Sequence, residues 1–309
     1  MPLDLASATA LERQLDGSGD PDGARLVTAL APGGSAPEWS WRHEHHRPRR
    51  AAVAALGENV QHCDLYDEIG SAMYHDITLG DDSELREILA LLRSAPPGPV
   101  LELAAGAGRM SLPIAASGRP VVALDMSPSL LHLLSERADT TLVRPARDRV
   151  EPVAGDMADF HLGRRFAVIA LGSTSITLLS AEQRQGLYRC VREHLEPGGI
   201  FLVTVPVPSH EAAEVTDIHR IVTGWSGREY DMYDAIVPGE DHRTVTVILR
   251  SPPDEGQRVP VAVSRPRLFD GRVIGTELAE HGFSHRTDAA IGDCTERLDV
   301  LVQTWEMTA

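Results

Sequence analysis

The segment that most constrains the fold of this chain is Val100 to Met110, which reads VLELAAGAGRM. A short apolar run ends in a loop of small residues before an apolar pattern resumes, as when a strand leads into a helix around a nucleotide. A dinucleotide site uses G-x-G-x-x-G, with an acid about twenty residues downstream. Here Gly106 and Gly108 supply two glycines and Ser111 replaces the third, while Glu102 lies inside the strand. The segment predicts a nucleotide-binding loop that departs from the dinucleotide pattern.

The overall charge limits the partners of the chain. Its 309 residues include 45 Asp and Glu against 29 Lys and Arg, a formal net charge of −16. A polyanion would meet repulsion, which argues against nucleic acid as a partner. We also expect no membrane contact and a cytoplasmic protein, because no apolar run reaches the roughly 18 residues of a membrane span and the N-terminal residues lack a signal pattern. Metal-site spacing is absent from the three cysteines, so we expect free thiols and no metal at Cys63, Cys190 and Cys294.

Strands and helices alternate through the middle of the chain. Short apolar runs predict strands at Val100–Leu103, Val121–Leu124, Val150–Val153, Phe166–Leu171 and Ile200–Val205. Helical signals between them include leucines at helical spacing from Leu85, a cap at Ser127 before Pro128, and a capping box of Ser180 and Gln183. This alternation predicts an α/β fold, a doubly wound, mostly parallel, seven-stranded Rossmann-like sheet with an antiparallel lid insertion.

Composition divides the chain into four regions. Residues 1–60, rich in Gly, Pro, Asp and Ala, predict an irregular N-terminal extension. Residues 61–208 predict a cofactor-binding core with N-terminal cap helices. In residues 209–266, EYDMYDAIV and RTVTVILR alternate like antiparallel strands joined at PGED, which predicts a lid over the substrate. Residues 267–309 predict a helix and strands that complete the core.

The ends of four predicted strands gather acids and small residues. Ligands of open parallel sheets bind at the carboxyl ends of the strands, so we expect the acids and small residues at these four strand ends to lie together. Carboxylates suit the hydroxyls of a ribose and the amino group of adenine, and apolar side chains suit the faces of the ring. We therefore expect Asp125 at the ribose, Asp156 at the adenine amine, and Met126 and Met157 as walls. A pyrophosphate would meet carboxylates here, a poor electrostatic match.

Four segments, VLELAAGAGR, ALDMS, GDM and HLEPGG, together resemble the class I S-adenosylmethionine-dependent methyltransferases over roughly residues 62 to 208. The resemblance implies S-adenosyl-L-methionine as the cofactor. One departure is Ala104, where the family most often has a glycine, and we expect a negative φ there. The cofactor-binding residues that follow are Tyr66, Glu102, Ala104, Gly106, Gly108, Arg109, Asp125, Met126, Asp156, Met157, Gly172 and Ser173.

A narrower resemblance rests on CDLYDEIGSAMYHD, GDMADF, LGSTSI and GLYRCVREHLEPGG. These segments look like the bacterial N-methyltransferases of peptide natural products, both the glycopeptide-antibiotic type and the daptide type. The likeness implies an amine acceptor, a peptide or a small molecule, with the N-terminal amine of a peptide favoured. Substrate contacts are expected from Tyr74, Ser175, Trp225, Tyr230 and Tyr233. Candidates for an oxygen near the methyl group or for a base are Tyr66, Tyr74, His75, His210 and His219, with none selected.

Three other functions stay open at the level of sequence. A small molecule could supply an oxygen or carbon acceptor instead of an amine. An NAD-dependent oxidoreductase would use Gly106, Gly108, Ser111 and Asp125, but leaves Glu102 without a role. A methyltransferase-like module without turnover would bind cofactor and serve as an assembly partner.

Overall fold

The structure is a computed structural model that describes residues 41–42, 49–81, 84–208, 217–237, 239–250, 257–291 and 298–308. These residues form two compact units. The described part of unit 1 lies within 82–212 and 270–309, and that of unit 2 within 35–81 and 213–269. The predictions made for His210, for Cys294 and for most of the N-terminal extension lie outside the described residues.

Unit 1 is built on a seven-stranded sheet in the order β12-β13-β7-β6-β3-β4-β5. The strands are β3 (Val100–Leu103), β4 (Val121–Asp125), β5 (Val150–Ala154), β6 (Phe166–Leu171), β7 (Leu195–Pro208), β12 (Phe283–Ile291) and β13 (Leu298–Met307). Strands β3 to β7 pair in parallel, whereas β13 is antiparallel to β7 and to β12. The predicted α/β fold with a mostly parallel sheet is confirmed. The strand order reverses between β3 and β6, which is where such sheets bind ligands.

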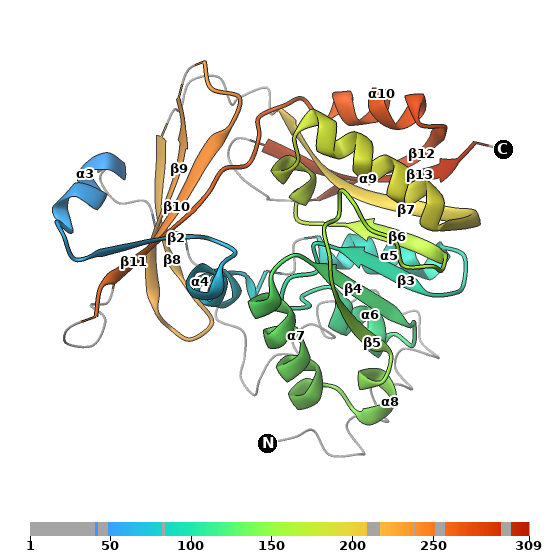
Figure 1. Ribbon diagram of the computed structural model, residues 1–309, viewed down its shortest axis with the longest axis horizontal. Helices are drawn as coiled ribbons and strands as arrows, with labels where there is room; N and C mark the ends of the chain where they lie inside the picture. Colours follow the sequence, from blue (N-terminus) through green and yellow to red (C-terminus); the bar gives the residue numbers. More distant parts are fainter. Residues whose placement is uncertain are drawn as a thin grey trace. The chain divides into compact units, whose positions relative to one another are not determined.

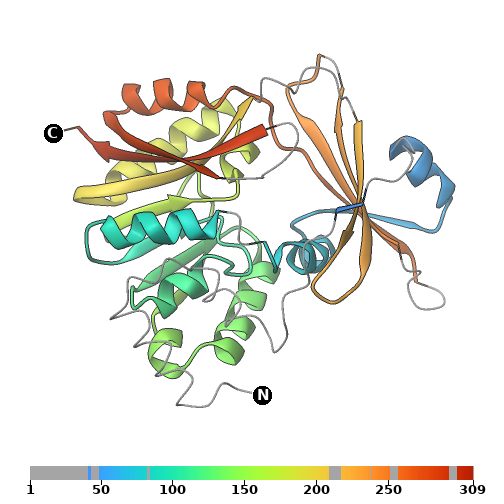
Figure 2. The ribbon, with the colours of Figure 1, turned by 180° about the vertical axis from the view of Figure 1, so that it is seen from behind.

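Helices cover both faces of this sheet. They are α5 (Leu85–Ser94), α6 (Ser111–Ala116), α7 (Pro128–Thr141), α8 (Arg144–Arg147), α9 (Ala181–His194) and α10 (Arg272–Glu280), with a 3₁₀ turn η1 at Ser175–Leu178. Figure 1 shows α9 and α10 in front of the sheet, and Figure 2, from behind, shows α5 and α6 on the opposite face. The apolar stripe of α5 packs with β3, β4, β6 and β7 in one buried cluster.

Local capping signals place the helices that frame the strand ends. The Ser127 hydroxyl accepts from the Leu130 N–H at 3.4 Å, with Pro128 in the first turn of α7. Ser180 and Gln183 form the predicted capping box at the start of α9. The strand predicted at Ile200–Val205 is longer in the structure, because β7 begins at Leu195 directly after α9 and includes the EPGG segment.

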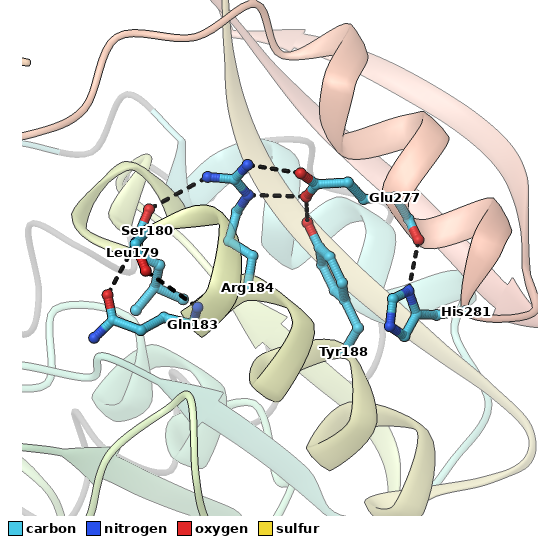
Figure 3. Close-up of polar contacts among 7 residues, drawn as sticks. All are labelled: Leu179, Ser180, Gln183, Arg184, Tyr188, Glu277 and His281. Carbon is cyan, nitrogen blue, oxygen red and sulfur yellow. Dashed lines mark hydrogen bonds and ion pairs between the residues drawn. The ribbon is translucent and has the colours of Figure 1, made fainter. Parts of the chain in front are cut away.

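A buried ion pair joins α9 to α10 on one face of the sheet (Figure 3). Arg184 donates from Nε and Nη2 to the two carboxylate oxygens of Glu277, at 2.8 and 2.6 Å. The Tyr188 hydroxyl donates to Glu277 Oε2 at 2.7 Å. Both side chains are largely buried, so removing one partner would leave the other charge buried and unpaired.

Unit 2 contains a six-stranded sheet in the order β1-β8-β9-β10-β11-β2. Its elements are β1 (Trp41–Arg42), α3 (Arg49–Ala55), β2 (Val60–Asp64), α4 (Glu68–Thr78), β8 (Asp217–Thr223), β9 (Glu229–Ile236), β10 (Arg243–Leu249) and β11 (Val259–Ser264). The predicted antiparallel pairing of the two alternating segments is confirmed as β9 with β10. Residues 61–81 were expected with the core, whereas the structure groups them in unit 2, because β2 pairs in parallel with β11.

The two faces of this second sheet are packed by different helices. Met73 and Ile77 of α4 pack in one cluster with Tyr230, while residues of α3 pack in another with Tyr233. Neighbouring side chains of a strand alternate between faces, so two tyrosines three residues apart separate in this way. No helix in the described part of the chain is long and apolar enough to cross a membrane.

Candidate nucleoside-binding site

The loop after β3 turns through three residues with positive φ. The φ angles are +53° at Ala104, +54° at Gly106 and +77° at Gly108. The expectation of a negative φ at Ala104 is therefore wrong, because the loop uses the left-handed conformation that favours glycine. A Cβ at Gly108 would lie 2.9 Å from the Leu134 Cγ, so only glycine allows the loop to pack on α7.

Asp125, at the end of β4, is bonded to this loop. Its Oδ2 accepts from the Gly106 N–H and its Oδ1 from the Ser127 N–H, each at 2.8 Å. Burial raises the pKa of Asp125, against the effect of these two hydrogen bonds. An ionised carboxylate offers about four lone-pair positions, so the two amides leave capacity for the hydroxyls of a sugar. The next residue, Met126, has 70% of its surface exposed and presents an apolar side chain beside the acid.

Glu102 lies inside the sheet and is only 3% exposed. Its Oε2 accepts from the hydroxyl of Ser111, the residue that stands in place of the third glycine. Burial raises the pKa of Glu102 to about 8, so the side chain is mostly protonated at neutral pH. Ser111 thus has a role that glycine could not fill, because its hydroxyl donates a hydrogen bond to buried Glu102.

The end of β5 lies next to that of β4. The Gly155 N–H donates to the Asp125 carbonyl at 3.0 Å. Asp156 is half-buried and accepts from the Ala158 N–H through Oδ1 at 2.8 Å, while Met157 is buried. Asp156 is thus the acid of a local turn, which is compatible with the predicted contact to an adenine amine but does not require it.

Glu84, which the sequence analysis did not identify, holds the end of β6. Ser173 and Thr174 have φ of +56° and +52°. The Glu84 carboxylate accepts from the Ser173 N–H at 2.7 and 2.8 Å and from Arg109 Nη2 at 2.5 Å. An acid just before a helix usually interacts with the helix N-terminus, so no local signal pointed to partners 25 and 89 residues away.

The predicted substrate residues fall in both units. Ser175 begins η1 in unit 1, while the other four lie in unit 2. The rings of Tyr66 and Tyr74 meet edge to face at 5.2 Å. Tyr230 and Tyr233 are each 2% exposed, and the Tyr230 hydroxyl donates to Asp76 at 2.7 Å. Tyr230 and Tyr233 are thus buried in the packing of unit 2, and Tyr230 also has its hydrogen bond to Asp76. The substrate roles of the five residues stay predictions.

The candidate histidines differ in their surroundings. His75 is half-buried on α4. His219 is buried, its Nε2 lies 2.7 Å from Asp231 Oδ1, and its ring stacks on Tyr233 at 4.4 Å. These contacts place His219 in the packing of the unit 2 sheet, and no candidate histidine in the described residues is singled out as a base.

Comparisons with known proteins match this chain to methyltransferases. A family model described as a methyltransferase domain matches residues 100–199. The glycopeptide N-methyltransferase MtfA, solved with (S)-adenosyl-L-methionine, is 31% identical, with a TM-score of 0.58, over 86% of this chain and 100% of its own. The structure of MtfA with sinefungin gives 32% identity and the same TM-score.

Two curated relatives come from Streptomyces. The cypemycin N-terminal methyltransferase of Streptomyces sp is 37% identical over 112 residues, 36% of this chain and 42% of that protein. The dTDP-3-amino-3,4,6-trideoxy-alpha-D-glucopyranose N,N-dimethyltransferase of Streptomyces venezuelae is 30% identical over 148 residues, 47% of this chain and 56% of that protein. The chain thus spans about half the length of these curated relatives.

Proposed function

Because the chain belongs to the S-adenosylmethionine-dependent methyltransferases, we propose that it methylates an amine nitrogen of a peptide natural product, the N-terminal amine being the favoured position. The observation that carries this proposal is the similarity to a glycopeptide N-methyltransferase over the whole of that chain. The relative named for N-terminal methylation of cypemycin supports the choice of amine.

The residues at the strand ends fit this cofactor. Asp125 retains lone pairs for ribose hydroxyls, and Met126 is exposed beside it for an adenine face. The cofactor supplies a methyl group on a positively charged sulfur. Carboxylates suit such a cation, and Arg109, the arginine of the loop, is engaged by Glu84. The same arrangement disfavours the pyrophosphate required by the NAD-dependent alternative, and the family membership of the chain leaves that alternative without support.

The chemical task of the protein is mainly positioning. Holding two reactants in line can contribute about 7–11 kcal/mol in favourable cases. An amine is mostly protonated at neutral pH, so a base or a desolvating site must deliver the free amine. The chain has a formal net charge of −16, and we propose that this negative charge attracts a cationic substrate. Tyr66 and Tyr74 are our candidates for supplying an oxygen near the methyl group.

An amino sugar is the second candidate acceptor. The dimethyltransferase from Streptomyces venezuelae is named for a nucleotide-linked amino sugar. Both acceptors are amines, so they share the chemistry of methyl transfer and differ only in what surrounds the nitrogen.

The test uses purified protein with deuterated-methyl cofactor and three acceptors: a peptide with a free N-terminus, the same peptide acetylated, and an amino sugar. Tandem mass spectrometry should place the label on the N-terminal nitrogen of the first peptide and nowhere on the second. Label on the amino sugar alone would show that the acceptor is the sugar and not the peptide. Label on oxygen or carbon, or cofactor binding with no product, would overturn N-methylation.

A further inference from the structure

Glu84 is a buried carboxylate that joins three parts of unit 1. It lies just before α5 and is only 4% exposed. Besides Ser173 and Arg109, it accepts from the hydroxyl of Thr204 in β7 at 3.1 Å. A buried charge is stable only with paired or hydrogen-bonded partners, and here an arginine, two hydroxyls and an amide supply them.

The carboxylate holds the end of β6 in a strained conformation. A left-handed φ is disfavoured at a residue other than glycine, and Ser173 and Thr174 adopt it in succession. Glu84 accepts both the N–H and the hydroxyl of Ser173, so it fixes the first of the two. A Cβ on Gly172 would lie 2.8 Å from Glu84 Oε1, so the glycine there is explained by the approach of this carboxylate.

The same carboxylate holds the loop that follows β3. Arg109 Nη2 donates to Glu84 Oε1 at 2.5 Å and to the Ser173 hydroxyl at 2.6 Å. Arg109 and Ser173 therefore both bind the Glu84 carboxylate, although they follow two different strands. Those strands, β3 and β6, are neighbours at the point where the strand order reverses, which is the expected place of the cofactor.

We propose that Glu84 is a positioning residue of the cofactor site, which holds the glycine loop through Arg109 and the end of β6 through Ser173 without touching the cofactor. This inference rests on the proposed function for its cofactor. It predicts that loss of the Glu84 charge weakens cofactor binding more than the accompanying loss of stability would.

Glu84→Gln is the test variant, and Glu277→Gln is its matched control, because Glu277 is another largely buried glutamate of unit 1 that pairs with an arginine. Calorimetry with S-adenosylmethionine should give a Kd at least about tenfold higher for Glu84→Gln. For Glu277→Gln the Kd should stay within about twofold while the melting temperature falls. A folded Glu84→Gln protein with the wild-type Kd would overturn the proposal.

Two variants cover the case in which Glu84→Gln fails to fold. Arg109→Met and Ser173→Ala remove single partners of Glu84 at more exposed positions, and each should raise the Kd. If both residues act through the same carboxylate, the Kd of the double variant should lie within about twofold of the higher Kd of the two single variants. Wild-type affinity in both singles, or effects that multiply, would contradict a shared role for Glu84.

Hydrogen exchange separates failure of this inference from failure of the proposed function. Without any ligand, the amides of 104–109 and 172–174 should exchange faster in Glu84→Gln, or in Arg109→Met if the first variant does not fold, than in Glu277→Gln. If the wild-type chain did not bind S-adenosylmethionine, the assignment of the cofactor would be refuted. If exchange at these amides were the same in the test variant as in Glu277→Gln, the positioning role of Glu84 would be refuted.

Discussion

Replacing Glu102 by glutamine should make the protein more stable at alkaline pH, and the gain should grow with pH. Burial raises the pKa of this carboxyl from 4.5 to about 8 in the folded chain. Below pH 4.5 both the folded and the unfolded states hold the proton, so Glu102 adds no pH dependence. Between 4.5 and about 8 the unfolded state releases the proton and the folded state retains it, so stability falls as pH rises.

The size of the effect follows from the two pKa values. Each pKa unit corresponds to about 1.4 kcal/mol, so the full difference is at most about 5 kcal/mol. The sequence pI is about 5.2, and the useful range begins above it. From pH 6 to 9 the free energy of unfolding of Glu102→Gln should rise relative to wild type by about 3 kcal/mol. Glutamine is a neutral isostere that can still accept from Ser111.

Urea denaturation across this pH range measures the difference directly. Other titrating groups are common to both proteins and largely cancel in the comparison. Glu136→Gln, whose side chain is 59% exposed, is the control, and it should stay within about 0.5 kcal/mol of wild type throughout. Parallel stability curves for Glu102→Gln and wild type would show that Glu102 is ionised in the folded state, and would refute the argument from burial.

Three further predictions concern Asp125, the loop after β3, and the contact between Tyr188 and Glu277. Asp125→Ala should weaken S-adenosylmethionine binding in calorimetry by at least about tenfold, or 1.4 kcal/mol, while exposed Asp139→Ala should not; equal affinities would contradict the ribose contact. Ala104 and Gly106 share nearly the same φ, and a Cβ on Gly106 would meet only Leu130 Cδ1, at 4.0 Å. Gly106→Ala should therefore lower stability by about 1–2 kcal/mol, and Ala104→Gly should raise it by up to about 1 kcal/mol; the same sign in both would disprove the strain. Tyr188→Phe should cost about 1.5–3 kcal/mol through its bond to Glu277, and a double-mutant cycle with Glu277→Gln should show coupling, whereas additive losses would mean that the bond contributes nothing.

The sequence predicted the parts of unit 1 whose signals are local. The strands β3 and β6 and the caps at Ser127 and Ser180 follow from short apolar runs and from capping residues. The clustering of strand ends followed from the topology of parallel sheets rather than from any single residue. Fold and family could therefore be predicted together.

The remaining features depend on contacts between distant residues. The partners of Glu84 lie on a loop, at a strand end and on β7, and no periodic pattern connects them. The left-handed φ of Ala104 could not be read from an alanine, because the residue type favours the opposite sign. The strands β2 and β11 pair although strands β3 to β10 lie between them in sequence, so residues 61–81 looked like part of the core.

Three buried acids in unit 1 have different partners, and these partners bear on the ligand that the site favours. Glu84 pairs with Arg109 and accepts from two hydroxyls. Glu102 retains its proton at neutral pH because it is buried. Asp125 accepts from one backbone amide with each oxygen, and the next residue in the chain, Met126, is exposed. Arg137 donates to the Ala107 carbonyl, and Arg109 donates to Glu84 and Ser173, so both arginines are engaged by groups of the protein. An approaching ligand therefore meets acceptors rather than cations, which favours an uncharged sugar and a positively charged sulfur over a phosphate chain.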